Sequence, residues 1–183
     1  MKKLIVLDRD GVINEDSDDY IKSPDEYVPI VGSLKAIADL NEAGYTVVVA
    51  SNQSGISRGL FSMATLEAMH EKLNTLLAEQ QGKIDKIYFC PHSPDGNCDC
   101  RKPKPGMLHE IIKDYDVTPS EVFLIGDSMK DIVAAHSAGM VPLLVCTGKG
   151  TKTKKQLANY EKLKSTPIFV NLAEAASWIL ERN

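Results

Sequence analysis

The stretch Leu4-Ile5-Val6-Leu7-Asp8-Arg9-Asp10-Gly11 decides the fold of this 183-residue chain. Its four consecutive apolar residues predict a strand that is buried on both faces, as the strands of parallel sheets are. The strand ends abruptly at Asp8, and Gly11 allows the backbone to turn sharply just behind two carboxylates. Apolar runs of the same style predict further strands at 47–50, 87–89, 122–125, 141–145 and 168–170.

Helical patterns alternate with these strands. Apolar residues at helical spacing predict helices over 34–40, 63–77, 108–115, 129–136 and 172–179. Ser62 is expected to cap the second helix, and Asn171 and Glu174 form a capping pair at the last. Residues 148–155 are interpreted as a surface loop that runs into a helix. The alternation predicts an α/β fold, a Rossmann-like parallel sheet with helices on both faces, and residues 1–183 are expected to form one domain.

The composition bounds the function as well as the fold. With 43% hydrophobic and 25% charged residues, the chain is ordinary for a globular protein, which excludes wholesale disorder. A formal net charge of −4 gives no reason to expect nucleic acid or an anionic membrane as a partner. No apolar run approaches the roughly 20 residues that span a bilayer, and the first one is too short for a secretory signal. We therefore expect a cytoplasmic monomer.

Polar residues follow each predicted strand, and ligands bind at the carboxyl ends of parallel strands. After the first strand, one of Asp8 and Asp10 could attack phosphorus while the other handles protons. Asp127 adds a third carboxylate, and Mg²⁺ would relieve the repulsion among the three. Lys102 supplies positive charge and Ser51 a hydrogen-bond donor. Asp131, one turn after Asp127, could orient either Lys102 or a water bound to the metal. The alternative interpretation is a turn with solvated aspartates.

A second cluster of ligand types lies between the third strand and the third helix. Cys90, His92, Cys98 and Cys100 form a Cys₃His set that suits a closed, tetrahedral Zn²⁺ site. The alternative is three unligated, buried cysteines. A disulfide between Cys98 and Cys100 is disfavoured, because the two residues are too close in sequence to form a good one. Zinc would fix the positions of Arg101 and Lys102, which directly follow Cys100. We therefore expect the zinc to be structural and not catalytic. Cys146 is interpreted as a plain core residue.

The order of these strand-end motifs resembles that of the haloacid dehalogenase superfamily of phosphatases, over about residues 4–131. The resemblance implies that Asp8 attacks the phosphate and becomes phosphorylated. It implies that Asp10 first protonates the leaving alkoxide and then deprotonates the hydrolytic water. Mg²⁺ would be held by the side chains of Asp8 and Asp127 and the main-chain carbonyl of Asp10, and Ser51 and Lys102 would stabilise the transferring phosphoryl group.

Within the superfamily, the cysteine pattern is similar to that of a small zinc-containing branch. Its members act on heptose 1,7-bisphosphate or on histidinol phosphate, and segments 52–59 and 100–107 resemble the heptose enzymes. The resemblance implies removal of the 7-phosphate of D-glycero-D-manno-heptose 1,7-bisphosphate, in the biosynthesis of nucleotide-activated heptose for lipopolysaccharide. Histidinol phosphate remains the alternative substrate. Ser128 stands where some heptose enzymes carry a lysine, which leaves the preferred anomer open.

The spacing of the motifs leaves no room for a large lid, so the site is expected to be essentially capless and to read its substrate with loops. The expected substrate contacts are Asp16, Tyr20, Asn52, Gln53, Ser54, Arg58 and Arg101. A second phosphate on a small sugar would suit the two arginines. Lys149, within Gly148-Lys149-Gly150, is either a phosphate ligand or ordinary loop material. His70 and His109 are interpreted as surface or packing residues.

Two other functions fit parts of the pattern. A phospho-accepting receiver domain also has a parallel sheet, an acidic cluster and Mg²⁺, but Cys90 stands where its phosphorylated aspartate would lie. A zinc-stapled binding module without turnover would not need the full set of Asp8, Asp10, Lys102 and Asp127.

Overall fold

The computed structural model describes residues 2–182. Within these residues, six strands form one sheet in the order β3-β2-β1-β4-β5-β6, and all neighbouring strands are parallel. The strands are β1 (Leu4–Leu7), β2 (Thr46–Asn52), β3 (Lys86–Cys90), β4 (Phe123–Gly126), β5 (Val141–Val145) and β6 (Ile168–Phe169). The predicted Rossmann-like parallel sheet is confirmed.

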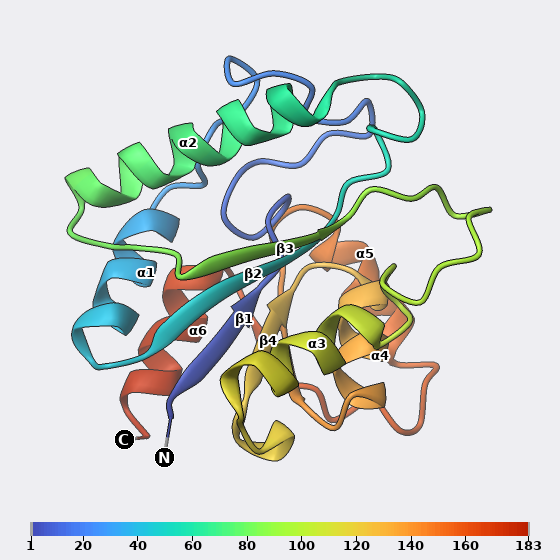
Figure 1. Cartoon of the computed structure of the whole chain (residues 1–183). Helices are drawn as coiled ribbons and strands as arrows, with labels where there is room; N and C mark the ends of the chain where they lie inside the picture. Colours follow the sequence, from blue (N-terminus) through green and yellow to red (C-terminus); the bar gives the residue numbers. More distant parts are fainter. Residues whose placement is uncertain (1, 183) are drawn as a thin grey trace.

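Helices cover both faces of this sheet, as predicted. They are α1 (Ser33–Glu42), α2 (Met63–Glu79), α3 (Gly106–Tyr115), α4 (Met129–Ser137), α5 (Gly150–Leu157) and α6 (Leu172–Leu180), with a 3₁₀ turn at Pro119–Glu121. In Figure 1, α1 and α6 lie to the left of the strands, and α3 and α4 lie to the right. None of the helices within the described residues is both long and apolar enough to cross a membrane.

The two faces of β1 show why the apolar run of that strand is continuous. Ile5 and Leu7 pack into a core with α1, α2 and α6, whereas Leu4 and Val6 pack into a second core with α3 and α4. Successive side chains of a strand point to opposite faces, so a strand with helices on both sides needs apolar residues at every position. The four buried positions of β1 therefore fix its place in the middle of the sheet.

The helix ends follow the sequence signals closely. The Ser62 hydroxyl accepts a hydrogen bond from the Thr65 amide at 3.1 Å, and the Asn171 side chain accepts one from the Glu174 amide at 3.0 Å, so both predicted caps are confirmed.

The loop expected at 148–155 is shorter than predicted, because α5 already begins at Gly150. This helix has only one narrow buried face, which a Lys- and Thr-rich stretch does not reveal.

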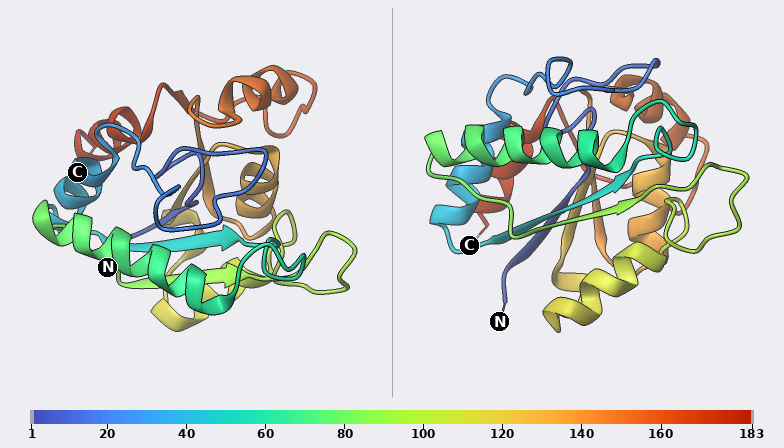
Figure 2. Two further views of the ribbon diagram at one scale, coloured as in Figure 1. Left: turned by 90° about the horizontal axis from the view of Figure 1, so that it is seen from above. Right: turned by 45° about the horizontal axis from the view of Figure 1, so that its top comes forward.

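The strand order reverses between β1 and β4, which is where an open α/β sheet forms its binding crevice. The amide of Asp8 donates to the Ile125 carbonyl at 2.9 Å and so continues the pairing of these two strands. Long connections meet at this edge: 8–32, 53–62 and 91–105. Figure 1 and Figure 2 show the last of them projecting from the end of β3. Of these, 8–32 contains only turns and isolated bridges in the described chain, so the site has no independent lid.

Candidate active site and metal centres

A cavity of about 280 Å³ opens at the carboxyl ends of β1, β2 and β4. Most of the residues that the sequence proposed for the site line it. These are Asp8, Asp10, Asp16, Tyr20, Ser51, Asn52, Gln53, Ser54, Arg101, Lys102 and Asp127. Arg58 does not line the cavity; it is exposed on the loop that follows β2. Ser17, Asp18, Ile21, Ser128, Lys130, Asp131 and Lys149 complete the lining.

Lys102 is the buried cation of the cavity. Its side chain is only 2% exposed, and its ammonium lies 3.1 Å from an Asp8 oxygen and 2.6 Å from an Asp131 oxygen. It also donates to the carbonyl of Ala50 in β2 at 2.5 Å. The second oxygen of Asp131 accepts from the amide and the hydroxyl of Ser128, which caps α4. Asp131 therefore joins Lys102 to the start of α4, the orienting position that the sequence indicated.

Burial and like charge shift the acidic groups of this cluster. Burial, followed by the charge of Asp131, raises the pKa of Asp8 to about 7. The same two causes raise the pKa of Asp127 to about 8. Burial alone would lower the pKa of Lys102, but the charges of Asp131 and Asp8 outweigh it and hold this pKa above its ordinary value. The site thus concentrates more negative charge than one lysine neutralises, which favours a bound cation.

The Asp127 carboxylate packs closely against the backbone of two loops. One of its carboxylate oxygens accepts from the amide of Lys149 at 2.7 Å. Gly11 and Gly148 both have positive φ, and a Cβ on either one would lie 2.2 Å from the same oxygen. The two glycines are therefore required by a close approach of two loops to Asp127, and not by turn geometry alone.

Asp10 is held by side chains from three places in the chain. Arg9 donates to both of its oxygens at 3.0 Å, the Asn14 amide donates to one at 2.8 Å, and the Gln53 amide donates to the other at 3.0 Å. Gln53 also donates to the Ser51 hydroxyl at 2.8 Å. In this geometry Gln53 connects the two predicted catalytic groups Asp10 and Ser51, a role that its position in the sequence did not indicate.

Arg9, like Asn14, binds Asp10 and was not among the residues that the sequence indicated. Its side chain is fully buried, and its guanidinium lies 5.7 Å from the centre of the Tyr27 ring. Alternation along β1 offers a signal, because Arg9 follows Ile5 and Leu7 at the same spacing of two residues and so belongs to the α1 and α2 face. Nothing in the sequence indicated a charged residue on this face, because arginine is rarely buried without an acidic partner. The partner of Arg9 is the adjacent residue Asp10.

Asn52 lines the cavity, but its side-chain polar groups bind the backbone of Lys102. Its side-chain amide donates to the Lys102 carbonyl at 2.9 Å, and its side-chain oxygen accepts from the Lys102 amide at 3.1 Å. Both polar groups of Asn52 are thus used to fix the chain on which Lys102 stands. The pairing of Asn52 with Cys90 across β2 and β3 ties this clamp to the start of the cysteine segment.

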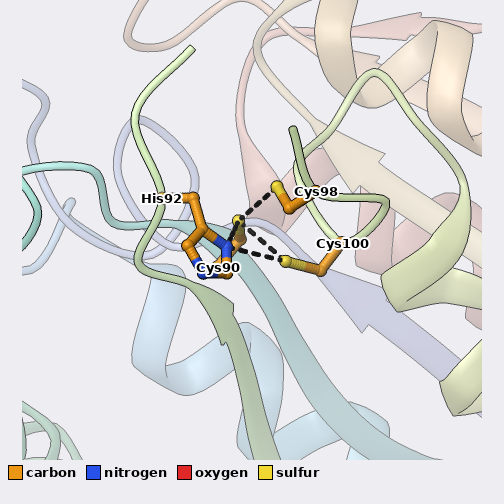
Figure 3. Close-up of side chains that lie close together, drawn as sticks. All are labelled: Cys90, His92, Cys98 and Cys100. Atoms are coloured by element: carbon orange, nitrogen blue, oxygen red, sulfur yellow. Dashed lines mark hydrogen bonds between the residues drawn. The ribbon is translucent and has the colours of Figure 1, made fainter. Parts of the chain in front are cut away.

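The four predicted zinc ligands converge, as Figure 3 shows. The Cys90 sulfur lies 3.7 Å from that of Cys98 and 2.9 Å from that of Cys100, and the Nδ1 atom of His92 lies 3.5 and 3.4 Å from the sulfurs of Cys90 and Cys100. All four ligand atoms lie within 4.8 Å of one another. Tetrahedral Zn²⁺ with Zn–S bonds of about 2.3 Å places its sulfurs about 3.7 Å apart, which is the Cys90–Cys98 separation, whereas the Cys90–Cys100 separation is shorter. Three thiols and one imidazole that converge in this way are the donor set of a structural zinc site.

The thiols of this cluster are electrostatically unequal. Burial raises the pKa of Cys98, but the hydrogen bond from the Arg101 backbone and those from the neighbouring ligands outweigh it and bring this pKa to about 7. Burial raises the pKa of Cys90. The Arg101 guanidinium also donates to the His92 carbonyl at 3.1 Å, so the cluster and the cavity share Arg101.

Comparison with known proteins gives a consistent family. Residues 99–175 match the model of the HAD-hydrolase-like family. A D-glycero-β-D-manno-heptose-1,7-bisphosphate 7-phosphatase of Pseudomonas aeruginosa is 52% identical over 181 residues, which cover 98% of this chain and 99% of the relative. The enzyme of the same name from Pseudomonas putida is 53% identical over 174 residues, covering 95% and 97% of the two chains.

A solved structure resembles the whole chain. The D,D-heptose 1,7-bisphosphate phosphatase from Bordetella bronchiseptica, in complex with magnesium and phosphate, superposes with a TM-score of 0.94. It is 50% identical and covers 99% of both chains.

Proposed function

The chain belongs to the haloacid dehalogenase-like hydrolase family, and on this premise we propose that it removes the 7-phosphate of D-glycero-β-D-manno-heptose 1,7-bisphosphate. The β anomer is the one that the names of its relatives specify. The reaction belongs to the biosynthesis of nucleotide-activated heptose. The observation that carries the proposal is the meeting of Asp8, Lys102 and Asp127 in one cavity of a chain so similar to these phosphatases.

The residues of the cavity are suited to an aspartyl-phosphate mechanism. Asp8 attacks phosphorus, the bond to the sugar oxygen breaks, and Asp8 carries the phosphoryl group. Asp10 gives a proton to the departing alkoxide and later takes one from the water that hydrolyses the aspartyl phosphate. Lys102 and Ser51 stabilise the negative charge on the transferring group. The four hydrogen bonds that hold Asp10 fix its carboxylate for the step in which it acts as a base.

The acidic cluster fits Mg²⁺. Asp8, Asp127 and Asp131 offer oxygens within 4.8 Å of one another, but Asp131 is already engaged by Lys102 and Ser128. Two carboxylates remain, which is the number that Mg²⁺ usually takes beside water and phosphate oxygens. Asp8, Asp127 and the main-chain carbonyl of Asp10 would hold it. The ion, when bound, neutralises charge on the phosphoryl oxygens and on the two carboxylates.

Zinc, held by Cys90, His92, Cys98 and Cys100, has a structural role in this proposal. A site with four protein ligands has no open position for substrate. The chain leaves the cluster directly into Arg101 and Lys102, both of which line the cavity. Fixing the cluster therefore fixes two cations of the active site, in a segment from 91 to 105 that has no helix or strand of its own.

The experiment that tests this function is a panel of substrates assayed with added Mg²⁺. We expect kcat/KM for heptose 1,7-bisphosphate to exceed that for fructose 1,6-bisphosphate and for histidinol phosphate. A value for histidinol phosphate equal to or above that for the heptose bisphosphate would assign the chain to the alternative substrate. A chain that becomes stably phosphorylated and hydrolyses none of the three would be a receiver domain. A chain that is neither phosphorylated nor active would be a binding module.

The proposed function also implies a cellular location and a set of partners. We place the enzyme in the cytoplasm, as a monomer that acts on a small phosphorylated sugar without nucleic acid or membrane as partner. The formal net charge of −4 gives no reason to expect nucleic acid or an anionic membrane as a partner.

A further inference from the structure

Lys149 stands on a loop that is fixed to the two strand ends of the active site. The Thr147 hydroxyl donates to the Gly11 carbonyl at 2.6 Å, and the Lys149 amide donates to the Asp127 carboxylate at 2.7 Å. Gly148 has φ +52°, and a Cβ there would lie 2.6 Å from the Cα of Gly11. The backbone of Lys149 is therefore set by the residues that follow β1 and β4.

The side chain of Lys149 crosses to the opposite wall of the cavity. Its ammonium lies 2.8 Å from an oxygen of Asp16 and 4.0 Å from one of Asp18. The side chain of Lys149 is 51% exposed and that of Asp16 is 16% exposed, and both residues line the cavity. Ion pairs of partly exposed, flexible side chains contribute little to stability, so this pair can be exchanged at small cost.

Two further cations, Arg101 and Lys130, line the cavity together with Lys149. Burial lowers the pKa of Lys130, and the charges of Arg101 and Lys149 lower it further, so the three cations act on one another. Within residues 2–182, neither Arg101 nor Lys130 forms an ion pair with a carboxylate. The cavity thus holds positive charge beyond the Lys102 that faces Asp8, and that charge is suited to a second anionic group of the ligand.

We propose that Lys149 is a specificity-determining residue of the proposed phosphatase, and that the phosphate which is not hydrolysed replaces Asp16 on its ammonium. The inference rests on the proposed function, because it takes a sugar bisphosphate as the ligand. A phosphate offers three acceptor oxygens and up to two charges, so it competes well with a single carboxylate for one lysine. A sugar monophosphate has no group for this place and leaves Lys149 paired with Asp16. Lys149 then favours bisphosphates without taking part in the chemical step.

The test compares kcat and KM of the Lys149→Met variant with those of the wild-type protein. The two substrates, heptose 1,7-bisphosphate and heptose 7-phosphate, differ only in the second phosphate. Removing one charge-assisted hydrogen bond should raise KM for the bisphosphate about ten-fold. The kcat should stay within about two-fold, because the interaction is the same in the ground state and the transition state. KM for the monophosphate should also change by less than about two-fold.

Two further variants control this result. Lys149→Arg keeps the charge and should restore most of the affinity for the bisphosphate. Lys152→Met removes an equally basic but outward-facing side chain of α5 and should leave both values of KM unchanged. An equal rise in KM for both ligands in Lys149→Met would overturn the inference, because Lys149 would then act through Asp127. An unchanged KM for the bisphosphate would overturn it as well.

The experiment distinguishes a failure of the inference about Lys149 from a failure of the proposed function. An unchanged chain that fails on the heptose bisphosphate but hydrolyses fructose 1,6-bisphosphate would reject the proposed substrate. The same comparison with fructose 1,6-bisphosphate and fructose 6-phosphate would then decide the role of Lys149.

Discussion

Asp8 is the residue on which the proposed mechanism depends most directly. Its carboxylate faces the buried ammonium of Lys102, and its backbone continues the pairing of β1 with β4. Asp8→Asn preserves the shape of the side chain and its capacity to accept a hydrogen bond from Lys102, but an amide oxygen does not form an acyl phosphate. We expect turnover to fall about a thousand-fold or more, with the fold and the zinc content unchanged.

Phosphate release and circular dichroism measure these two effects. Asp25→Asn is the matched control, because Asp25 is exposed and lies outside the cavity, and this variant should be fully active. Near-normal kcat in Asp8→Asn would show that the phosphoryl group is not transferred to this residue.

His70 gives the protein a dependence of stability on pH. Burial, followed by the charge of Arg9, lowers the pKa of His70 to about 4 from an ordinary value of 6.5, and its buried Nε2 atom has no hydrogen-bond partner. The unfolded chain therefore binds a proton below pH 6.5 that the folded chain takes up only near pH 4. Stability that is complete above pH 6.5 is lost as pH falls toward 4, by about 1–3 kcal/mol after allowance for the partial exposure of the ring.

Denaturation at several pH values measures the contribution of this histidine. In His70→Leu the loss between pH 6.5 and 4 should be smaller by that amount, since the variant removes the titrating group. In His109→Gln, which changes an exposed histidine, the loss should equal that of the unchanged chain. An identical pH dependence in His70→Leu would contradict the assignment.

Single residues also mark the limit of what the sequence could predict about the site. Asp8, Asp10 and Asp127 were found because each follows a strand, and their place in the cavity follows from that alone. Partner choice is different, because it depends on side-chain rotamers and on loops that approach in three dimensions. Gln53 lines the cavity, as expected of a residue that contacts substrate, but the donation of its amide to Asp10 and Ser51 was not predicted. No periodicity in the sequence encodes such a contact.

At the scale of elements, the loops after β1 and β5 meet on Asp127 through two glycines. Gly11 has φ +83°, and a Cβ there would lie 2.2 Å from the Asp127 carboxylate. Gly44, at the end of α1, has φ +85° with nothing within 4 Å. Gly11→Ala should therefore lower kcat/KM about 100-fold by displacing Asp127, whereas Gly44→Ala should cost about 1 kcal/mol of stability and keep activity.

Steady-state kinetics and thermal melting distinguish the two variants. The pair separates backbone strain, which both share, from the clash, which only Gly11→Ala introduces. Equal activity in the two variants would mean that the approach of these loops does not position Asp127.

The proposed zinc ligands lie at the end of β3 and in the segment that connects it to α3. Cys100→Ser removes one of the four proposed ligands and should lower both the zinc content and the activity, the latter about 10- to 100-fold, because Arg101 and Lys102 follow directly. Cys146→Ser is the matched control, since Cys146 directly follows β5 and lies outside the cluster. The interpretation of Cys146 as a core residue is wrong, because its side chain is only partly buried where the chain leaves the strand. Elemental analysis and phosphatase assays check both variants, and full activity of a zinc-free Cys100→Ser protein would contradict the structural role.

Element boundaries were predictable where one physical signal dominated. The apolar runs located all six strands, because a strand covered on both faces has no freedom to be polar. β2 runs on to Asn52, two residues beyond its predicted end, because Ser51 and Asn52 pair with β3 although they are polar. The start of α5 was missed for a related reason, since its Lys-rich sequence offers only Thr153 and Leu157 to the interior beside Gly150.

At the scale of the whole molecule, the sheet order brings together what the sequence keeps apart. The alternation of strands and helices predicts a parallel sheet, but it leaves the order of the strands open. The observed order places β1 between β2 and β4, so residues near positions 8, 51 and 127 face one crevice. The cysteine segment reaches the same edge because β3 pairs with β2. Function follows from this neighbourhood, and not from any one motif.

We therefore expect Mg²⁺ to be removed from the whole protein much more easily than zinc. Mg²⁺ would be held at the strand ends by only two carboxylate side chains beside a main-chain carbonyl, and it needs water and phosphate to complete its shell. Zinc would have four protein ligands in a closed set. Brief treatment with EDTA should abolish phosphatase activity, and Mg²⁺ alone should restore it, while elemental analysis still finds about one zinc per chain. If activity returned only when zinc was added, the catalytic and structural roles assigned to the acidic and cysteine clusters would have to be exchanged.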